Sequence, residues 1–204
     1  MTNIITITRE FGSGGRTVGK MLATRLGYSF YDKDIDAAVA EESGLSPDFI
    51  SESGEDANAT TSFLFNLSRS VSTGGYTMPL HDKIFVTQCR IIKQLAANGP
   101  CVIVGHCADY ILREQKDCLN VFIYADMESR AKRVVELYGE TDKAIEKRLK
   151  EKDDKRKVYY KNYTEQCWGR MQNYHVCLDS GRFGTEKCVD IIESMVEKAP
   201  VHSN

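Results

Sequence analysis

The chain has 204 residues, of which 42% are hydrophobic and 27% charged, and its formal net charge is −2 at pH 7. These are ordinary values for a globular protein, and a domain of this size can bury roughly 70% of its unfolded surface without a disulfide or a metal. The charge balance excludes a general attraction to nucleic acid or to acidic membranes, so any anion site must be built locally.

Cysteine usage and the N-terminal sequence indicate the compartment. The seven cysteines are scattered singly and no CxxC pair occurs, which argues against a disulfide framework and a zinc site and favours reduced thiols. The chain opens on the strand-like run IITIT rather than on a signal peptide. No apolar run approaches the roughly 20 residues needed to cross a bilayer. We therefore expect a cytoplasmic protein with no nucleic-acid or membrane partner.

The first part of the chain predicts a strand, a glycine-rich turn and a helix. Residues 3–8 (NIITIT) are short, β-branched and apolar, as in a buried strand. The turn REFGSGG follows over residues 9–15. Apolar residues then recur at three- and four-residue spacing over residues 16–26, which predicts an amphipathic helix that ends at Gly27.

The next elements are shorter. Residues 28–31 (YSFY) predict a second strand, and residues 32–42 a helix with Asp32 as its N-cap and Gly44 as its stop. Ser46-Pro47 is typical of another helix start. Residues 72–75 (STGG) look like the most flexible segment of the chain.

The second half of the chain continues to alternate strands with helices. We predict strands at 101–104, 119–125 and 176–178, and helices at 80–97, 128–138, 140–163 and 185–198. Such alternation favours a mostly parallel sheet covered on both faces, in a single domain over residues 1–204. Because ligands bind at the carboxyl ends of such strands, the ends at Thr8-Arg9, Tyr31-Asp32, Gly105-His106 and Ala125-Asp126 should converge on one site.

The glycine-rich turn between a strand and a helix predicts an anion cradle, in which backbone N–H groups and the helix dipole face phosphate oxygens. The turn does not match the pattern GxxxxGK[ST]. An ungapped alignment puts Arg9 at the first glycine and Gly15 at the lysine, and it keeps the apolar phase of the helix. A shift by one puts Arg16 at the lysine and Thr17 at the magnesium-binding hydroxyl. In either register the candidate nucleotide-binding residues are Gly12, Ser13, Gly14, Gly15, Arg16 and Thr17.

Four segments resemble the cytidylate kinase-like family, a divergent branch of the P-loop nucleotide kinases. They are ITITREFGSGGRTVGKMLATRLGYSFYDKDI, PCVIVGHCADYIL, LNVFIYADMESRAKRV and DDKRKVYYKNYTEQCWG, which cover nearly the whole chain in order. The resemblance implies a three-layer α/β P-loop kinase fold with a five-stranded parallel sheet, an acceptor-binding helical region at about 33–97 and a lid at about 140–164. It also implies ATP and Mg²⁺ as donor and cofactor.

The lid segment carries candidate catalytic residues. Arg148, Lys152 and Arg156 are spaced four apart, so a helix presents them on one face. A lid arginine can contribute about 10³–10⁵ in the rate of phosphoryl transfer. Asp153 and Arg156 match the DxxR pattern of the family's lid, and with Arg16 and Arg148 they are our catalytic candidates. A solvated charged helix is the alternative, as it is for Arg130 and Arg133, which could flank the adenine or the phosphates.

Three further residues are candidates for binding the acceptor: Asp32, His106 and Asp109. Asp32 follows the second strand and could hold a hydroxyl or an amine of the acceptor. His106 stands where nucleotide kinases usually have an arginine, and Asp109 is one residue out of step with the family's acidic position.

These residues predict ATP-dependent phosphoryl transfer to a small-molecule acceptor, with a nucleoside monophosphate such as CMP or dCMP foremost. Two alternatives stay open, namely a kinase of a non-nucleotide metabolite and a nucleotide-binding regulator without turnover. A homodimer through the apolar residues of helix 80–97 is also left open.

Overall fold

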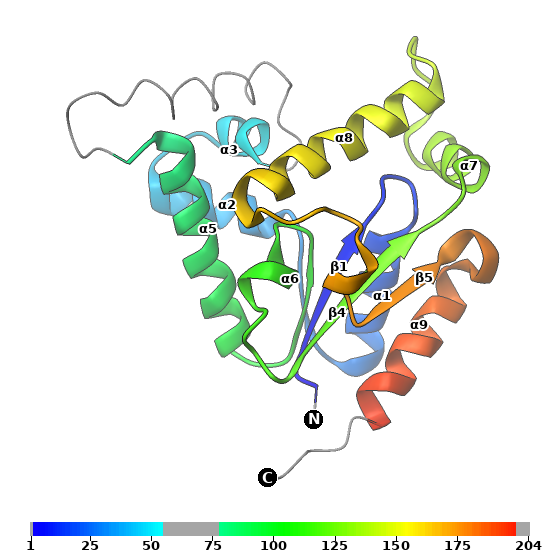
Figure 1. The fold of residues 1–204 in the computed structure, drawn as a ribbon, viewed down its shortest axis with the longest axis horizontal. Coiled ribbons are helices and arrows are strands. Elements are labelled where there is room, and N and C mark those ends of the chain that lie inside the picture. Colours follow the sequence, from blue (N-terminus) through cyan, green and yellow to red (C-terminus); the bar gives the residue numbers. More distant parts are fainter. Residues whose placement is uncertain (1, 55–77, 199–204) are drawn as a thin grey trace.

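The computed structural model describes residues 2–54 and 78–198, in which five parallel strands form one sheet. The strand order is β2-β3-β1-β4-β5, so the N-terminal strand lies in the centre (Figure 1). The strands are β1 (Ile4–Arg9), β2 (Ser29–Tyr31), β3 (Cys101–Val104), β4 (Cys118–Tyr124) and β5 (Val176–Asp179). The predicted fold class, an α/β fold with a five-stranded parallel sheet, is confirmed.

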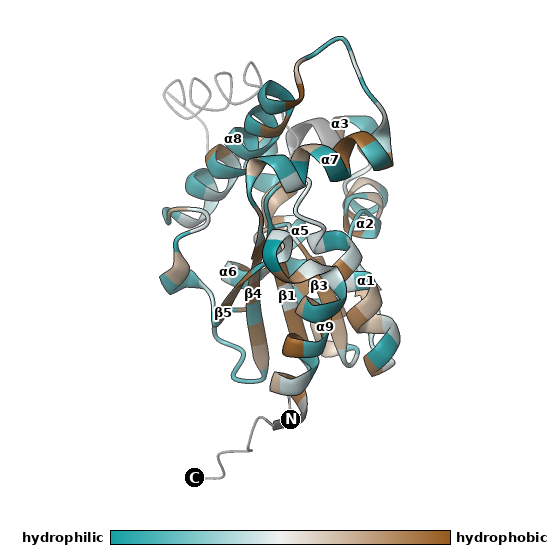
Figure 2. Cartoon of the chain, turned by 90° about the vertical axis from the view of Figure 1, so that its right-hand side faces the viewer, coloured by the Kyte–Doolittle hydropathy of each residue, from teal (hydrophilic) through white to brown (hydrophobic). Residues whose placement is uncertain are grey.

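Helices cover both faces of the sheet. On one face α1 (Gly15–Leu26) packs beside α9 (Ser180–Lys198). On the other lie α2 (Asp34–Ser43), α5 (Leu80–Ala97) and α6 (Ala108–Ile111). Successive residues of a strand point to opposite faces, so Val102 and Val104 join the core under α1 and α9 whereas Ile103 joins the core under α5. Figure 2 shows the resulting hydrophobic sheet between helices whose outer surfaces are hydrophilic.

The observed helix ends confirm some predicted caps and correct one. Gly27 and Gly44 adopt the left-handed conformation after α1 and α2. Ser46 caps α3 (Pro47–Ser53), because its hydroxyl accepts a hydrogen bond from the Phe49 N–H at 3.2 Å. Asp32 is not the N-cap of α2: Lys33 holds that position, and the Asp32 side chain faces Arg16 instead.

The remaining boundaries differ by a few residues. The charged helix α8 spans Ile145–Thr164, so the predicted helix over residues 140–144 does not form. Helix α9 begins before residue 185, with a non-helical break at Gly184. The short helices α6 and η1 (Met171–Asn173) were not predicted. The predicted flexible segment at 72–75 lies outside the described residues.

Two helices stand over the carboxyl edge of the sheet. They are α7 (Met127–Tyr138), which follows β4, and α8, which crosses above β1 (Figure 1). The C-terminal half of α8 is fixed in the core, where Tyr159 and Tyr160 are buried beside α5. Their burial anchors α8 over the site.

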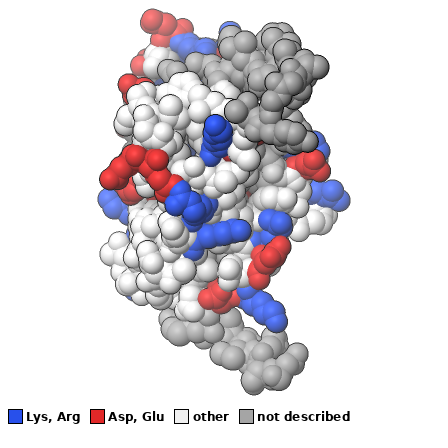
Figure 3. Space-filling model, turned by 90° about the vertical axis from the view of Figure 1, so that its left-hand side faces the viewer, with Lys and Arg blue, Asp and Glu red and all other residues white. Residues whose placement is uncertain are grey.

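The outer face along α5 has no concentrated charge. Figure 3, which views the molecule from this side, shows lysine and arginine side chains intermixed with acidic ones, in several places side by side. Leu80 and Val86 are among its exposed apolar residues, and a homodimer through α5 stays a prediction. None of the helices in 2–54 and 78–198 is long and apolar enough to span a bilayer.

Candidate active site

The glycine-rich turn brings the N-terminus of α1 to the carboxyl edge of the sheet. Gly12 and Gly14 have φ values of 80° and 79°, in the left-handed region that glycine adopts without strain. Gly14 is the N-cap of α1, and no side chain makes a capping hydrogen bond to it. The backbone N–H groups in the first turn of a helix have no intrahelical acceptor and carry the positive end of its dipole. The loop therefore presents the elements of an anion site.

A cavity of about 550 Å³ opens in front of this helix end. Its size is typical of a site for a small ligand. Seven of the residues lining it are basic and two are acidic, although the whole chain has a net charge of −2. The basic residues are Arg9, Arg16, Lys33, Arg133, Arg148, Lys152 and Arg156, and the acidic ones are Glu10 and Asp32. The chain as a whole is not basic, but basic side chains are concentrated around the glycine loop.

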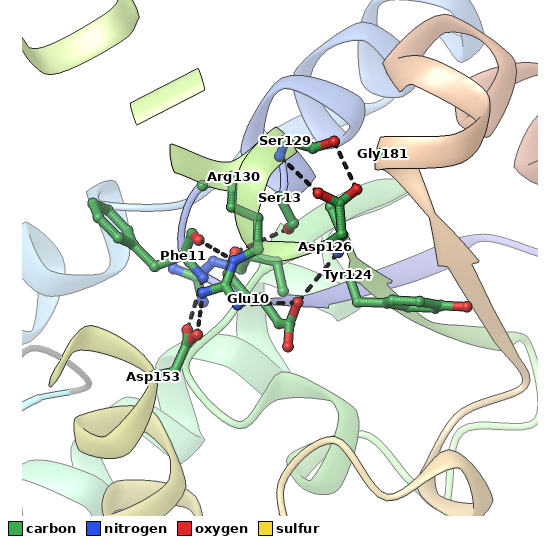
Figure 4. A network of polar contacts seen from close by, with 12 residues as sticks. Glu10, Phe11, Ser13, Tyr124, Asp126, Ser129, Arg130, Asp153 and Gly181 are labelled. Carbon is green, nitrogen blue, oxygen red and sulfur yellow. Dashed lines mark hydrogen bonds and ion pairs between the residues drawn. The ribbon is translucent and has the colours of Figure 1, made fainter. Parts of the chain in front are cut away.

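A buried ion pair holds the tip of the loop (Figure 4). The Arg130 side chain, from α7, donates from Nε to the Phe11 carbonyl at 2.8 Å and pairs through Nη2 with Asp153 of α8. Asp153 in turn accepts a hydrogen bond from the Phe11 N–H at 2.8 Å. Both side chains are about 5% exposed. Both backbone polar groups of Phe11 are therefore hydrogen-bonded, the carbonyl to a residue of α7 and the N–H to a residue of α8.

Further contacts fix the rest of the loop backbone. Arg133 donates to the Gly12 carbonyl at 2.7 Å, and Arg156 donates to the Arg9 carbonyl at 3.0 Å. Ser13 is buried, and its hydroxyl donates to the Glu10 carbonyl at 2.9 Å. These bonds set the shape of the loop without a ligand, which is the preorganisation that electrostatic catalysis requires.

Glu10 lies beneath the loop beside the buried ion pair. Its carboxylate accepts from the Ala125 N–H at 3.2 Å and lies 3.4 Å from Arg130 Nη1. Burial raises the pKa of Glu10 above its ordinary value, while the Arg130 charge opposes that rise. Glu10 therefore links the loop to the end of β4.

Of the predicted acceptor residues, Asp32 lines the cavity and His106 and Asp109 do not. The Asp32 carboxylate, through Oδ2, lies 2.6 Å from Nε of Arg16. His106 is buried behind it in a left-handed conformation (φ 57°), with Nε2 3.1 Å from the Asp32 carbonyl. Because that partner is a carbonyl, Nε2 must carry a hydrogen. The other ring nitrogen lies 3.6 Å from a carboxylate oxygen of Asp36. His106 thus supports the backbone and does not line the cavity.

Asp109 is deeper still. It is 4% exposed and accepts a hydrogen bond from the Tyr160 hydroxyl at 2.7 Å. Burial, together with the Asp109 charge, raises the pKa of Tyr160 well above its usual range, so the hydroxyl remains a donor. The structure therefore places Asp109 in a bond that ties α6 to α8.

The cavity brings together most of the predicted site residues and adds others. Gly12, Gly14, Gly15, Arg16, Thr17, Asp32, Arg148 and Arg156 line it, whereas Ser13, Asp153, His106 and Asp109 do not. The sequence prediction missed Arg9 and Lys33 as lining residues. It also missed the stacking of Phe11 on Tyr138, whose ring centroids are 6.1 Å apart. An arginine at a position usually held by glycine was the sign in the sequence that could have identified Arg9.

Thr17, Glu10 and Asp32 are the cavity residues with an aliphatic hydroxyl or a carboxylate of the kind that binds Mg²⁺. Glu10 already contacts Arg130 and the Ala125 N–H, and Asp32 pairs with Arg16. In the part of the chain that the structure describes, no cluster of three or more His, Cys, Asp or Glu residues could hold a metal ion. Magnesium in phosphate-transfer sites commonly takes one or two protein ligands and completes its shell with phosphate oxygens and water. The Thr17 hydroxyl, which lines the cavity, fits that arrangement as a single protein ligand.

Comparison with known proteins assigns the family. The model of the cytidylate kinase-like family matches residues 4–182 of the chain. The chain belongs to this family. The resemblance found in the sequence is thereby confirmed. A shikimate kinase from Geobacter sulfurreducens is 32% identical over 102 residues, which are 46% of this cytidylate kinase-like chain and 55% of the relative. The match thus spans about half the length of that relative.

Two solved structures extend the comparison over the whole fold. An uncharacterized protein from Eubacterium ventriosum superimposes with a TM-score of 0.72 at 27% identity, covering 96% of this chain and 99% of the other. The shikimate kinase from Acinetobacter baumannii in complex with shikimate gives a TM-score of 0.56 at 14% identity, with coverages of 98% and 96%. The second match shows that the cytidylate kinase-like chain shares the fold of a small-molecule kinase.

Proposed function

We propose that this protein transfers a phosphoryl group from MgATP to a small acceptor. The observation that carries the proposal is the preorganised glycine loop at the uncapped N-terminus of α1, which faces seven basic side chains. Phosphoryl transfer needs little covalent chemistry from a protein, because positioning and stabilisation of the phosphate charge supply most of the catalysis. The cavity contains the groups for both tasks.

Each part of the cavity has a role in this proposal. The N–H groups at the start of α1 bind the polyphosphate, and the Thr17 hydroxyl would hold Mg²⁺. The metal would neutralise charge on the phosphates. Arg148, Lys152 and Arg156 of α8 face the phosphoryl group as its charge redistributes. Asp153 and Arg130 act through the loop and position it.

The acceptor that family membership supports is a nucleoside monophosphate such as CMP or dCMP, bound near Asp32. We assign its binding to the helical region at about 33–97, and closure over the nucleotide to the segment at about 140–164. Asp32 would hold a polar group of the acceptor, while Arg16 fixes the orientation of the Asp32 carboxylate.

A second acceptor class is a hydroxylated metabolite without a phosphate. The observation that favours it is the position of His106, which is buried against the Asp32 carbonyl and adds no cation to the cavity wall. The similarity to a shikimate kinase points the same way. Both classes keep the same donor, loop and α8 cations.

A coupled assay of ADP release tests the proposal across CMP, dCMP, other nucleoside monophosphates and shikimate. Lys152→Ala removes a cation from the cavity wall, and we expect the rate to fall at least about tenfold. Lys150→Ala is the matched control, because Lys150 lies on the same helix, is 76% exposed and pairs with Asp154 outside the cavity. Binding of MgATP without turnover on any acceptor would refute the kinase and favour the regulator.

A further inference from the structure

The first residue of α1 is a glycine because of its neighbour and not because of its backbone. Gly15 is not among the glycines with a positive φ, so its backbone conformation suits other residues as well. A Cβ at position 15 would overlap the Cβ of Arg9 and lie 3.1 Å from its Cγ. The next neighbour, the Cβ of Ile123, is at 3.4 Å, an ordinary contact. Arg9 alone among these neighbours therefore excludes a side chain at Gly15.

This arrangement reverses the usual P-loop pattern. In the ungapped alignment with GxxxxGK[ST], residue 9 stands at the first glycine and residue 15 at the lysine. The chain thus has arginine where glycine is expected and glycine where lysine is expected. The first carbons of the Arg9 side chain fill the space that a side chain at position 15 would use, and Arg9 lines the cavity.

We infer that Arg9 binds the outer phosphates of the nucleotide in place of the missing loop lysine. Its backbone is well fixed for this, because Arg156 donates to its carbonyl at 3.0 Å and the next N–H, of Glu10, donates to Ile123 at 3.0 Å. A guanidinium keeps its charge and offers a fork of donors that can bind two phosphate oxygens. This inference depends on the proposed nucleotide site.

Arg16, the other candidate for the lysine's role, pairs with Asp32. Its Nε lies 2.6 Å from the Asp32 carboxylate, and its side chain is 59% exposed. In this inference the two arginines have different roles. Arg16 orients Asp32 on the acceptor side, and Arg9 binds the phosphates of the nucleotide.

Reciprocal exchange of the two residues tests the inference by titration calorimetry with MgATP and AMP. Arg9→Gln keeps the Cβ and Cγ but removes the charge. We expect MgATP to bind about tenfold to a hundredfold more weakly, as for loss of a charge-assisted hydrogen bond, with AMP affinity unchanged. The double variant Arg9→Gly/Gly15→Lys should regain most of the MgATP affinity that Arg9→Gly loses. Its matched control, Arg9→Ala/Gly15→Lys, retains the overlapping Cβ and should not.

The outcomes distinguish a failure of this inference from a failure of the proposed function. MgATP affinity within twofold of the wild type in Arg9→Gln, or equal recovery in the two double variants, would overturn the inference. Equal loss of AMP and MgATP affinity in Arg9→Gln would also overturn it, because that result indicates a collapsed loop and not a missing phosphate ligand. A wild-type protein that binds no adenine nucleotide would instead refute the proposed function. Urea unfolding of every variant identifies those that are folded.

Discussion

Replacing Arg130 by methionine should strongly destabilise the protein, because the guanidinium is buried among three partners. It donates to the Phe11 carbonyl at 2.8 Å, pairs with Asp153 and lies 3.4 Å from the Glu10 carboxylate. Methionine fills part of the space but removes the closer of the two cations beside Asp153, which is 5% exposed; the other, Arg156, lies 3.7 Å away. Removing one partner of a buried pair costs about 3–5 kcal/mol, a large share of the roughly 5–15 kcal/mol that stabilises a domain. We expect urea denaturation to show a loss of that size.

The double variant Arg130→Met/Asp153→Asn separates the pair from general packing. It leaves no buried Asp153 charge, so its loss should be smaller than the sum of the two single losses by about 2 kcal/mol. Arg113→Met is the matched control, because Arg113 is 48% exposed and its carboxylate partner Glu114 is 3.7 Å away, and we expect a change within about 1 kcal/mol. Additive losses, or an Arg130→Met loss no larger than that of Arg113→Met, would refute the reasoning.

Three further predictions follow from buried groups elsewhere in the fold. Tyr160→Phe removes the hydroxyl that donates to buried Asp109 and should lower the free energy of unfolding by about 1–3 kcal/mol; an unchanged urea midpoint would contradict this. Iodoacetamide at pH 8 should modify exposed Cys167 long before Cys101 and Cys118, because burial raises the pKa values of those two thiols to about 11 and about 12 and the thiolate is the reactive form. Mass spectrometry checks this order, and labelling of Cys118 at the rate of Cys167 would disprove it. The same two thiols ionise near pH 8.5 in the unfolded chain, so above that pH the unfolded chain binds fewer protons than the folded one. The free energy of unfolding should therefore fall as pH rises through about 9–11. A flat profile of this free energy against pH would exclude the effect.

Local pattern was enough to predict most of the fold. The β-branched run that forms β1 and the apolar spacing of α1 report directly on burial, and Gly27 and Gly44 are at the helix ends where glycine is expected. Asp32 was assigned wrongly as a cap, because the same residue type also suits an ion pair and only the fold brings Arg16 beside it.

The site was harder to predict, because its key contacts join distant parts of the chain. Asp153 binds the Phe11 N–H from 142 residues away, and helical spacing cannot reveal which loop a helix will meet. The sequence predicts that His106 binds the acceptor. In the structure its backbone is left-handed and its ring is buried behind Asp32. The role proposed for Arg9 rests on the space around Gly15, which a sequence does not show.

The attachment of α8 limits how the site could open. From Asp153 onward its inward-facing residues Asp153, Arg156, Tyr159 and Tyr160 hold the loop or lie in the core. An outward movement of the whole helix would therefore break the hydrogen bonds from α8 that fix the loop. We expect nucleotide exchange to move only the first two turns of α8 and the connection before them, where Gly139 has a φ of 72°. Arg148 and Lys152 would then travel with the moving part, while Arg156 stays with the fixed one.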